Sequence, residues 1–177
     1  MGLLRKNLLI TGLPGVGKTT LIRELARELR DHNPVGFFTA EIREGGVRKG
    51  FELISLDKRR RVLAHVDIRS RHCVGRYKVD MEGFEDFLTL IPFEDPRRKL
   101  VIIDEIGKME CFSARFRKVL LELLDSERWV IATIALKGGG IIEEIKQRQD
   151  IGLFEINVGN REPLVAEIVK EIRVPDA

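Results

Sequence analysis

The sequence has few of the residues on which several classes of protein depend. It contains only two cysteines, Cys73 and Cys111, and they form no CxxC pair, so neither a disulfide framework nor a zinc site is indicated. No apolar run approaches the length of about 18 residues that a membrane span requires, and the N-terminal residues show no signal-peptide pattern. These absences predict a cytoplasmic protein that does not associate with membranes.

Amides are scarce as well, with two Gln and four Asn in 177 residues, whereas 33% of the residues are charged. That charged fraction exceeds the average of about 25%, and the combination is typical of proteins from thermophilic sources. The 44% apolar content excludes a disordered chain. A net charge of +3 and a pI near 9.0 suit an anionic ligand, and a nucleotide satisfies this as well as a nucleic acid does.

Short apolar runs alternate with amphipathic helical patterns along most of the chain. The expected strands are residues 8–11, 35–39, 100–103, 129–134 and 154–158. The expected helices are residues 21–29, 81–91, 113–124, 141–148 and 163–172. This alternation predicts a single α/β domain over residues 1–177, with a mostly parallel sheet flanked by helices on both faces.

The stretch of about residues 45–80 interrupts the alternation. Residues 50–66 show a period of two on either side of Asp57-Lys58, which predicts an inserted antiparallel hairpin. Residues 68–78 are basic and have little periodicity, so we expect an irregular loop that is mobile or covers a ligand.

Residues 12–19, GLPGVGKT, match the GxxxxGK[ST] phosphate-loop pattern (Walker A) between an expected strand and an expected helix. The glycines let backbone N–H groups point at phosphate oxygens, and the start of the helix adds its positive dipole end. We expect Lys18 to reach the β and γ phosphates and Thr19 to ligate Mg²⁺. The nucleotide-binding residues predicted in this segment are Gly12, Leu13, Pro14, Gly15, Val16, Gly17, Lys18, Thr19 and Thr20.

Two carboxylates end the apolar run at residues 100–103. Asp104 has the position of a Walker B aspartate and is expected to be the partner of Thr19 at the metal. Glu105 is placed to orient or deprotonate an attacking water, as in the catalytic-glutamate branch of P-loop NTPases. A lone Asp-Glu pair would more simply be a strand end at the surface, but the phosphate loop upstream favours the chemical interpretation.

Further polar residues have two interpretations each. Thr133 suits a contact with the γ-phosphate or the attacking water, and equally a buried strand position. Lys108 and Lys137 are either cations near the developing negative charge or solvated loop lysines. The candidates for a stabilising arginine are Arg43, Arg76 and Arg161.

Three stretches resemble the cancer-related nucleoside-triphosphatase family: GLPGVGKTT at residues 12–20, GFFTAEIREGGVRKG at 36–50 and DEIGKME at 104–110. Asn160-Arg161 is a weaker fourth match. The resemblance implies a RecA-like sheet and hydrolysis of ATP, GTP, CTP and UTP to diphosphate and phosphate. It also implies that Lys108 joins Lys18 and Glu105 in catalysis. By its position after a strand, the Asn160-Arg161 loop is expected to line the base or ribose of the nucleotide.

Two other functions are compatible with a phosphate loop. The first is a small-molecule or nucleotide kinase with residues 69–78 as its lid. Glu105 disfavours this function, because it is placed to position water, whereas a kinase site excludes water. The second is a nucleotide-dependent switch that acts on RNA through the basic residues 58–61. That cluster is more typical of an exposed strand edge, and no aromatic RNA-binding motif accompanies it. Nucleic acid is therefore not expected as a partner, and the sequence indicates no protein partner.

Overall fold

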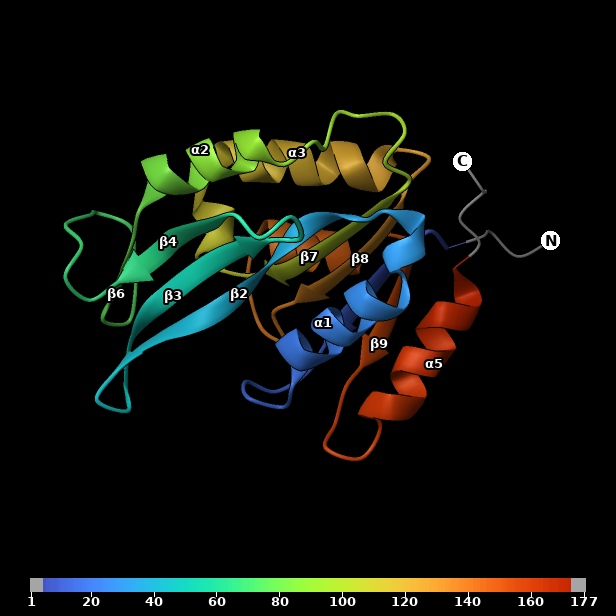
Figure 1. Ribbon diagram of the computed structural model, residues 1–177, viewed down its shortest axis with the longest axis horizontal. Coiled ribbons are helices and arrows are strands. Elements are labelled where there is room, and N and C mark those ends of the chain that lie inside the picture. The colour runs from blue at the N-terminus through green and yellow to red at the C-terminus, as the bar shows by residue number, and fades with distance from the viewer. Residues whose placement is uncertain (1–4, 173–177) are drawn as a thin grey trace.

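A nine-stranded mixed sheet runs through the protein, whose computed structural model describes residues 5–172 (Figure 1). The strand order is β5-β6-β4-β3-β2-β7-β8-β1-β9. The parallel part consists of β1 (Asn7–Thr11), β2 (Val35–Glu44), β7 (Leu100–Ile106), β8 (Trp129–Ile134) and β9 (Ile151–Glu155). The antiparallel part adds β3 (Val47–Ser55), β4 (Arg60–His65), β5 (Cys73–Val74) and β6 (Tyr77–Val79). The prediction of an α/β fold with a parallel core and an antiparallel insertion is confirmed.

Helices cover both faces of the parallel part (Figure 1). One face carries α1 (Lys18–Glu28) and α5 (Arg161–Glu171), and the other carries α2 (Met81–Leu90), α3 (Ala114–Asp125) and the short α4 (Ile141–Lys146). Two 3₁₀ turns, η1 (Arg30–His32) and η2 (Glu110–Phe112), complete the elements. Ser113 caps α3 as predicted, because its hydroxyl accepts a hydrogen bond from the Phe116 N–H at 3.0 Å. In the described part of the chain, no helix is long and apolar enough to cross a membrane.

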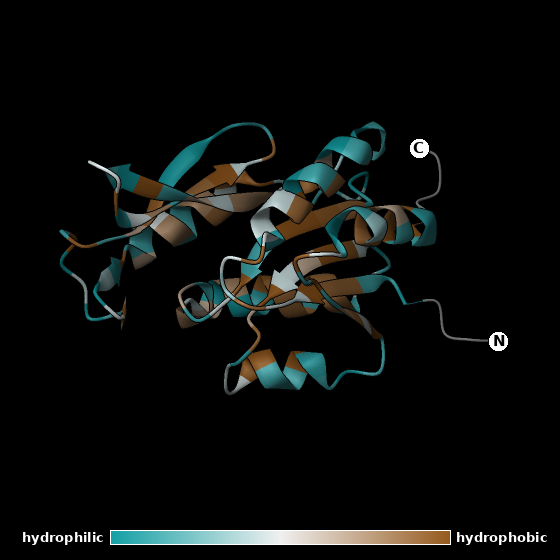
Figure 2. Cartoon of the chain, turned by 90° about the horizontal axis from the view of Figure 1, so that it is seen from below, coloured by the Kyte–Doolittle hydropathy of each residue, from teal (hydrophilic) through white to brown (hydrophobic). Residues whose placement is uncertain are grey.

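The alternation of side chains along the strands divides the core into two layers. In β7, Val101 and Ile103 pack in the layer beneath α2 and α3, whereas Leu100 and Ile102 pack in the layer beneath α1 and α5. The parallel strands are accordingly apolar along much of their length, while the helices carry polar residues on their outer sides (Figure 2). Burial on both faces fixes the carboxyl ends of these strands relative to one another.

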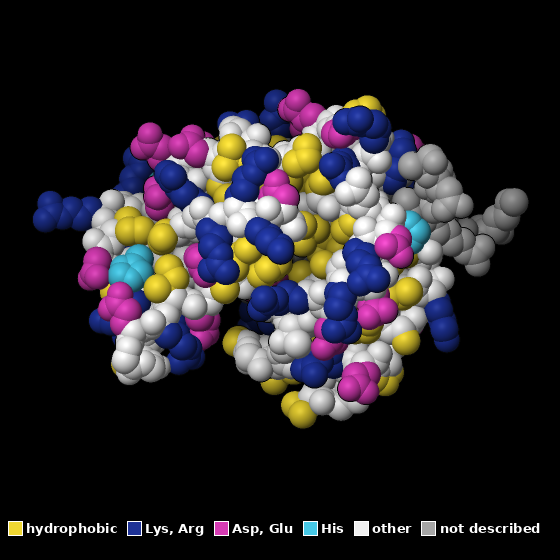
Figure 3. Space-filling view, in the orientation of Figure 1, with side chains coloured by type: hydrophobic (Ala, Val, Ile, Leu, Met, Phe, Trp, Pro, Cys, Tyr) yellow, Lys and Arg dark blue, Asp and Glu magenta, His cyan; other side chains and the backbone are white. Residues whose placement is uncertain are grey.

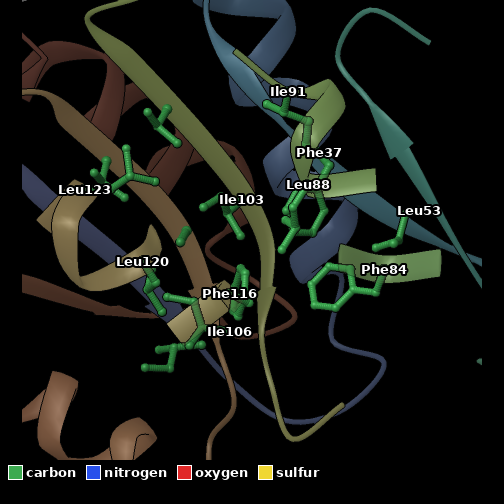
Figure 4. Close-up of a cluster of buried hydrophobic side chains, with 14 of the residues drawn as sticks. Phe37, Leu53, Phe84, Leu88, Ile91, Ile103, Ile106, Phe116, Leu120 and Leu123 are labelled. Carbon is green, nitrogen blue, oxygen red and sulfur yellow. The ribbon is translucent and has the colours of Figure 1, made fainter. Parts of the chain in front are cut away.

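The layer beneath α2 and α3 is packed with leucine, isoleucine, valine and phenylalanine side chains, several of which Figure 4 shows. The ring of Phe37 meets the ring of Phe84 edge-on, with 6.3 Å between their centroids, and Phe84 lies 5.5 Å from Phe116. These three residues come from β2, α2 and α3. These aromatic contacts therefore pack β2, the strand that continues into the antiparallel part, against both α2 and α3.

The insertion contains a turn that the sequence analysis did not predict, because β2 is longer than expected. β2 does not end at residue 39 but continues to Glu44, pairs with β7 through Val35–Phe37, and pairs with β3 along most of its length. Gly45 and Gly46, with φ of 55° and 79°, form the tight turn into β3. The second turn, at Asp57-Lys58, lies where the sequence predicted it. One strand thus serves both parts of the sheet.

The prediction of an irregular loop over residues 68–78 is wrong for its second half. β5 and β6 form a small antiparallel hairpin at the sheet edge. The ring of Tyr77 is buried edge-on against Phe51 at 5.1 Å, and its hydroxyl accepts a hydrogen bond from Arg48 Nε at 2.9 Å. Strands of two and three residues are too short to show periodicity, so only these tertiary contacts reveal them.

The last strand also differs from its prediction of residues 154–158. β9 begins three residues earlier and pairs with β1 from Asn7↔Ile151 to Thr11↔Glu155. Val158 is 94% exposed and lies in the loop before α5. The strand therefore ends level with β1, because pairing with β1 and not the local apolar pattern sets its register.

Candidate active site

A cleft of about 810 Å³ opens at the carboxyl ends of the parallel strands. One wall is the loop after β1 together with the start of α1, and the other wall is the β2–β3 hairpin. In the space-filling view the molecule is hollowed at its lower edge between these elements, and Lys and Arg side chains border the hollow (Figure 3). Ligands of open α/β sheets bind at this end of the strands.

The phosphate-loop segment forms most of the first wall. Its residues line the cleft with the exception of Val16, which packs against the core beneath α1 and α5. Gly17 has φ of 106° and precedes the first residue of α1, a left-handed position that favours glycine. Lys18 Nζ donates hydrogen bonds to the carbonyls of Gly12 at 3.1 Å and Leu13 at 3.3 Å. The ammonium group thus lies across the loop, beside the helix N-terminus.

Asp104 is fully buried and accepts hydrogen bonds from three threonine hydroxyls. Thr19 Oγ1 and Thr39 Oγ1 donate to Oδ2 at 2.7 and 3.1 Å. Thr133 Oγ1 donates to Oδ1 at 2.6 Å. These threonines come from α1, β2 and β8, and the last two strands are the neighbours of β7 in the sheet. The parallel topology therefore brings all four side chains to one point.

Thr39 is a site residue that the sequence reasoning missed. It was expected to be the last residue of a strand, and a polar side chain at the carboxyl end of a parallel strand was the available signal. What the sequence did not reveal is that β2 lies next to β7, which carries Asp104. That adjacency brings the Thr39 hydroxyl to the carboxylate.

The oxygens around Asp104 fit a magnesium ion. Hydroxyl and carboxylate oxygens are the hard ligands that Mg²⁺ prefers, and within residues 5–172 no Lys, Arg or His forms an ion pair with Asp104. The same residues contain no group of three or more His, Cys, Asp or Glu side chains that could hold a metal. A metal at this point would thus depend on Thr19, Asp104, water and phosphate oxygens.

Glu105 lines the cleft next to the buried Asp104. The pairing of β7 with β8 is irregular between Ile103 and Ile106, which lets two consecutive side chains reach the same end of the sheet. Burial raises the pKa of the Glu105 carboxyl group, the charge of Asp104 raises it further, and Lys18 lowers it. A carboxyl group with a raised pKa in a cleft suits a general base.

The remaining predicted residues lie at different distances from the cleft. Lys137 lines it, whereas Lys108 is exposed and is not part of its lining. Asn160 uses its side chain within its own loop, accepting from the Asn157 N–H at 2.8 Å and donating to the Glu155 carbonyl at 2.9 Å. Arg161 lies behind the phosphate loop, where its guanidinium pairs with Glu24 at 3.8 Å.

The arginines that line the cleft are Arg23 and Arg48, which were not among the three candidates from the sequence. Of those candidates, Arg43 bonds to Glu41 and to the Gly46 carbonyl at the hairpin turn. Arg76 donates to the carbonyl of Arg48 at 2.7 Å. Arg48 reaches the cleft from β3, so its position depends on strand pairing that the sequence pattern does not display.

Comparison with known proteins shows the family of the chain. The family model described as NTPase matches residues 7–169. The chain belongs to the NTPase family. It is 44% identical to the nucleoside-triphosphatase THEP1 of Thermotoga maritima over 94% of this chain and 95% of that protein. It is 37% identical to the human cancer-related nucleoside-triphosphatase over 93% of this chain and 95% of that protein.

Two solved structures share the fold of this NTPase family member. The crystal structure of THEP1 from Aquifex aeolicus superimposes with a TM-score of 0.85 at 32% identity, covering 95% of this chain and 99% of that one. The solution structure of a human cancer-related nucleoside triphosphatase gives 0.81 at 32% identity, covering 97% and 99%. The family resemblance expected from the sequence motifs is confirmed.

Proposed function

We propose that this enzyme hydrolyses nucleoside triphosphates to nucleoside diphosphate and phosphate in a Mg²⁺-dependent reaction with little discrimination between bases. The observation that carries the proposal is the meeting of three features in one cleft: the phosphate loop, the buried Asp104 with its three hydroxyl donors, and Glu105. The names of the relatives, nucleoside-triphosphatases from bacteria and from Homo sapiens, support it.

Binding of the triphosphate falls to the first wall of the cleft. The backbone N–H groups of residues 12–17 and the ammonium group of Lys18 neutralise the phosphate oxygens. Thr19 and Asp104 would hold Mg²⁺, which supplies further neutralisation of charge on the β and γ phosphates when bound. Thr39 and Thr133 orient the Asp104 carboxylate by donating to its two oxygens.

The chemical step falls to Glu105. Its carboxylate accepts a hydrogen bond from a water and orients that water in line with the γ-phosphorus. The raised pKa makes the Glu105 carboxylate a stronger base, which favours acceptance of the water proton. Lys137, in the lining of the cleft, adds positive charge on this side, and Lys108 is proposed to act from the adjoining loop.

Low base discrimination follows from where the binding contacts lie. The residues of the phosphate-loop wall would contact the phosphates and the bound metal. These groups are the same for every nucleoside triphosphate. Asn160 and Arg161 remain the proposed contacts for base or ribose, but the Asn160 side chain is occupied by its own loop and so offers little readout of a base. The relatives' names likewise specify no base.

The proposed compartment is the cytoplasm. Cys73 and Cys111 are both free thiols. A reducing compartment keeps such thiols reduced. Fractionation of the source cells tests this point.

The test is phosphate release from ATP, GTP, CTP and UTP, each measured with Mg²⁺ and with EDTA. We expect hydrolysis of all four within about tenfold of one another in kcat/KM, since the discriminating contacts are few. We expect EDTA to abolish it. Hydrolysis of one triphosphate alone would contradict the proposed breadth, and equal rates in EDTA would contradict the metal. Tight binding without phosphate release would favour a phosphotransferase that awaits its acceptor.

A further inference from the structure

Glu110 is the last residue of the DEIGKME motif, and the mechanism above gives it no role. It begins η2 and is only 5% exposed. Within residues 5–172 no Lys, Arg or His forms an ion pair with it. Backbone N–H groups of Glu110 and Gly107 are its hydrogen-bond partners, and burial without a cation makes ionisation of this carboxyl group costly.

The carboxyl groups of Glu110 and Glu105 both lie close to Gly107. A Cβ on Gly107 would lie 2.8 Å from Glu110 Oε2 and 3.3 Å from Glu105 Oε1. Both carboxyl groups therefore lie against the same side of this glycine and are neighbours of each other. Gly107 is not among the glycines with positive φ, so its side chain is missing for reasons of space and not of backbone conformation.

The protonation state of Glu110 suits a hydrogen bond to its neighbour. Burial raises the pKa of the Glu110 carboxyl group to about 8, the charges of Glu105 and Asp104 raise it as well, and nearby backbone N–H groups of Glu110 and Gly107 lower it. At neutral pH Glu110 is therefore mainly a neutral acid with an O–H to donate, whereas an ionised carboxylate only accepts. Hydrogen bonds from an acid to a carboxylate are among the strong ones.

We propose that Glu110 is a positioning residue of the hydrolytic site, which holds the Glu105 carboxylate across Gly107 in the orientation that the attacking water requires. This inference rests on the proposed function, because it assigns to Glu110 an effect exerted through Glu105. Glu110 itself is not part of the lining of the cleft. Gly107 contributes to this arrangement, since a Cβ there would crowd the carboxyl group of Glu110 and press on that of Glu105.

Few other charges face this pair. On the strand side these are Asp104 and, beyond Glu105, Lys18. From η2 comes Cys111, where burial raises the thiol pKa to about 12 and so keeps the group neutral. From α3 comes Arg117, whose guanidinium donates to the carbonyls of Cys111 and Phe112. Glu110 is therefore the group whose ionisation near pH 8 changes the charge beside Glu105.

The first test compares Glu110→Gln, which keeps a hydrogen-bond donor of the same shape, with Glu110→Leu, which removes it. At pH 7 we expect Glu110→Leu to lower kcat about 30-fold with the Kd for ATP unchanged, and Glu110→Gln to stay within about threefold of the wild type. Wild-type kcat should fall above about pH 8, where Glu110 ionises, and Glu110→Gln should lack this fall. A folded Glu110→Leu with wild-type kcat, or an equal loss in both variants, would overturn the inference.

A second test leaves Glu110 in place. Gly107→Ala adds one methyl group that crowds both carboxyl groups, and we expect kcat to fall about tenfold with unchanged ATP affinity. Gly139→Ala is the matched control, because a Cβ there meets no atom within 4 Å. A wild-type kcat in Gly107→Ala would contradict the inference.

The failure of this inference is distinguishable from failure of the proposed function. If Glu105→Gln hydrolyses ATP at the wild-type rate, the proposed function itself is wrong. If Glu105→Gln is inactive while Glu110→Leu and Gly107→Ala match the wild type, only the role of Glu110 is wrong.

Discussion

The two walls of the cleft are built in different ways. The phosphate-loop wall is mostly backbone from one continuous segment, residues 12–17, and it rests on parallel strands that are buried on both faces. The hairpin wall consists of side chains from two strands, Glu41 of β2 with Arg48 and Phe51 of β3. The first wall therefore depends on local conformation, and the second depends on the register in which distant residues pair.

Polar contacts hold the hairpin wall together. Arg48 pairs with Glu41 at 2.8 Å, bonds to the Tyr77 hydroxyl at 2.9 Å, and lies 5.2 Å above the ring of Phe51. The hydrogen bond from Arg48, followed by that from Arg43, lowers the pKa of Glu41. Glu41 and Arg48 remain partly exposed, so solvent weakens each of these interactions. We accordingly expect substitutions in the phosphate-loop wall to have the larger effects.

The largest effect is expected from Lys18→Ala in the phosphate-loop wall. Loss of the ammonium group from the phosphate site should lower kcat/KM about 1,000-fold. Steady-state phosphate release measures it. Lys118→Ala, which removes an exposed lysine of α3, is the control. Near-normal hydrolysis by Lys18→Ala would contradict the expectation that the phosphate-loop wall contributes more to catalysis than the hairpin wall.

The next effect concerns the stability of the fold at Glu110 in η2, behind Glu105. The folded-state pKa of Glu110 is about 8, above the ordinary value of 4.5, so between these values the folded protein retains a proton that the unfolded chain releases. The contribution of Glu110 to stability is therefore fully present below about pH 4.5 and falls as pH rises toward 8, so over this range the wild type should lose roughly 3 kcal/mol relative to Glu110→Gln. Denaturant unfolding of both proteins at pH 5 and pH 8 measures this difference. Parallel pH dependence in the two proteins would show that Glu110 is not the group responsible.

A smaller effect is expected at Thr39, which lies on β2, the strand that belongs to both the parallel and the antiparallel part of the sheet. Thr39→Val removes one hydroxyl donor to Asp104 while keeping the shape, and we expect kcat to fall about tenfold. Titration of Mg²⁺ should show weaker metal activation. Thr89→Val, on the exposed side of α2, is the matched control. Unchanged kcat and metal dependence would mean that Thr19 and Thr133 suffice to orient Asp104.

The smallest effect is expected from the hairpin wall. Arg48→Ala should raise KM about threefold and cost about 1 kcal/mol of stability, because it breaks partly exposed contacts with Glu41 and Tyr77. Steady-state kinetics and thermal unfolding measure the two quantities. A loss of kcat as large as that of Lys18→Ala would instead identify Arg48 as the arginine that stabilises the transition state, and the contrast between the walls would not hold.

The same contrast explains what the sequence could predict. The phosphate loop and the Asp104-Glu105 pair were recognisable because each is a local pattern next to an apolar strand. Thr39, Arg23 and Arg48 were not, since their places in the site follow from the order of strands or from the position of α1 in space.

The errors in the fold have the same cause. β9 begins earlier than its apolar pattern suggested, because its pairing with β1 sets the register. β5 and β6 are too short to leave a pattern, and the burial of Tyr77 against Phe51 stabilises them. Long or capped elements such as α3 were predicted well, because their boundaries are encoded locally.

The measurement that tests the account most directly is single-turnover phosphate release from bound Mg²⁺-ATP by the wild type and by Glu105→Gln, with the Kd for ATP determined on the same samples. We expect release by the wild type without any added acceptor. We expect release at least about 100-fold slower by Glu105→Gln, with ATP affinity unchanged. Equal rates in the two proteins, or tight ATP binding by the wild type with no release, would contradict the claim that Glu105 directs water to the γ-phosphate.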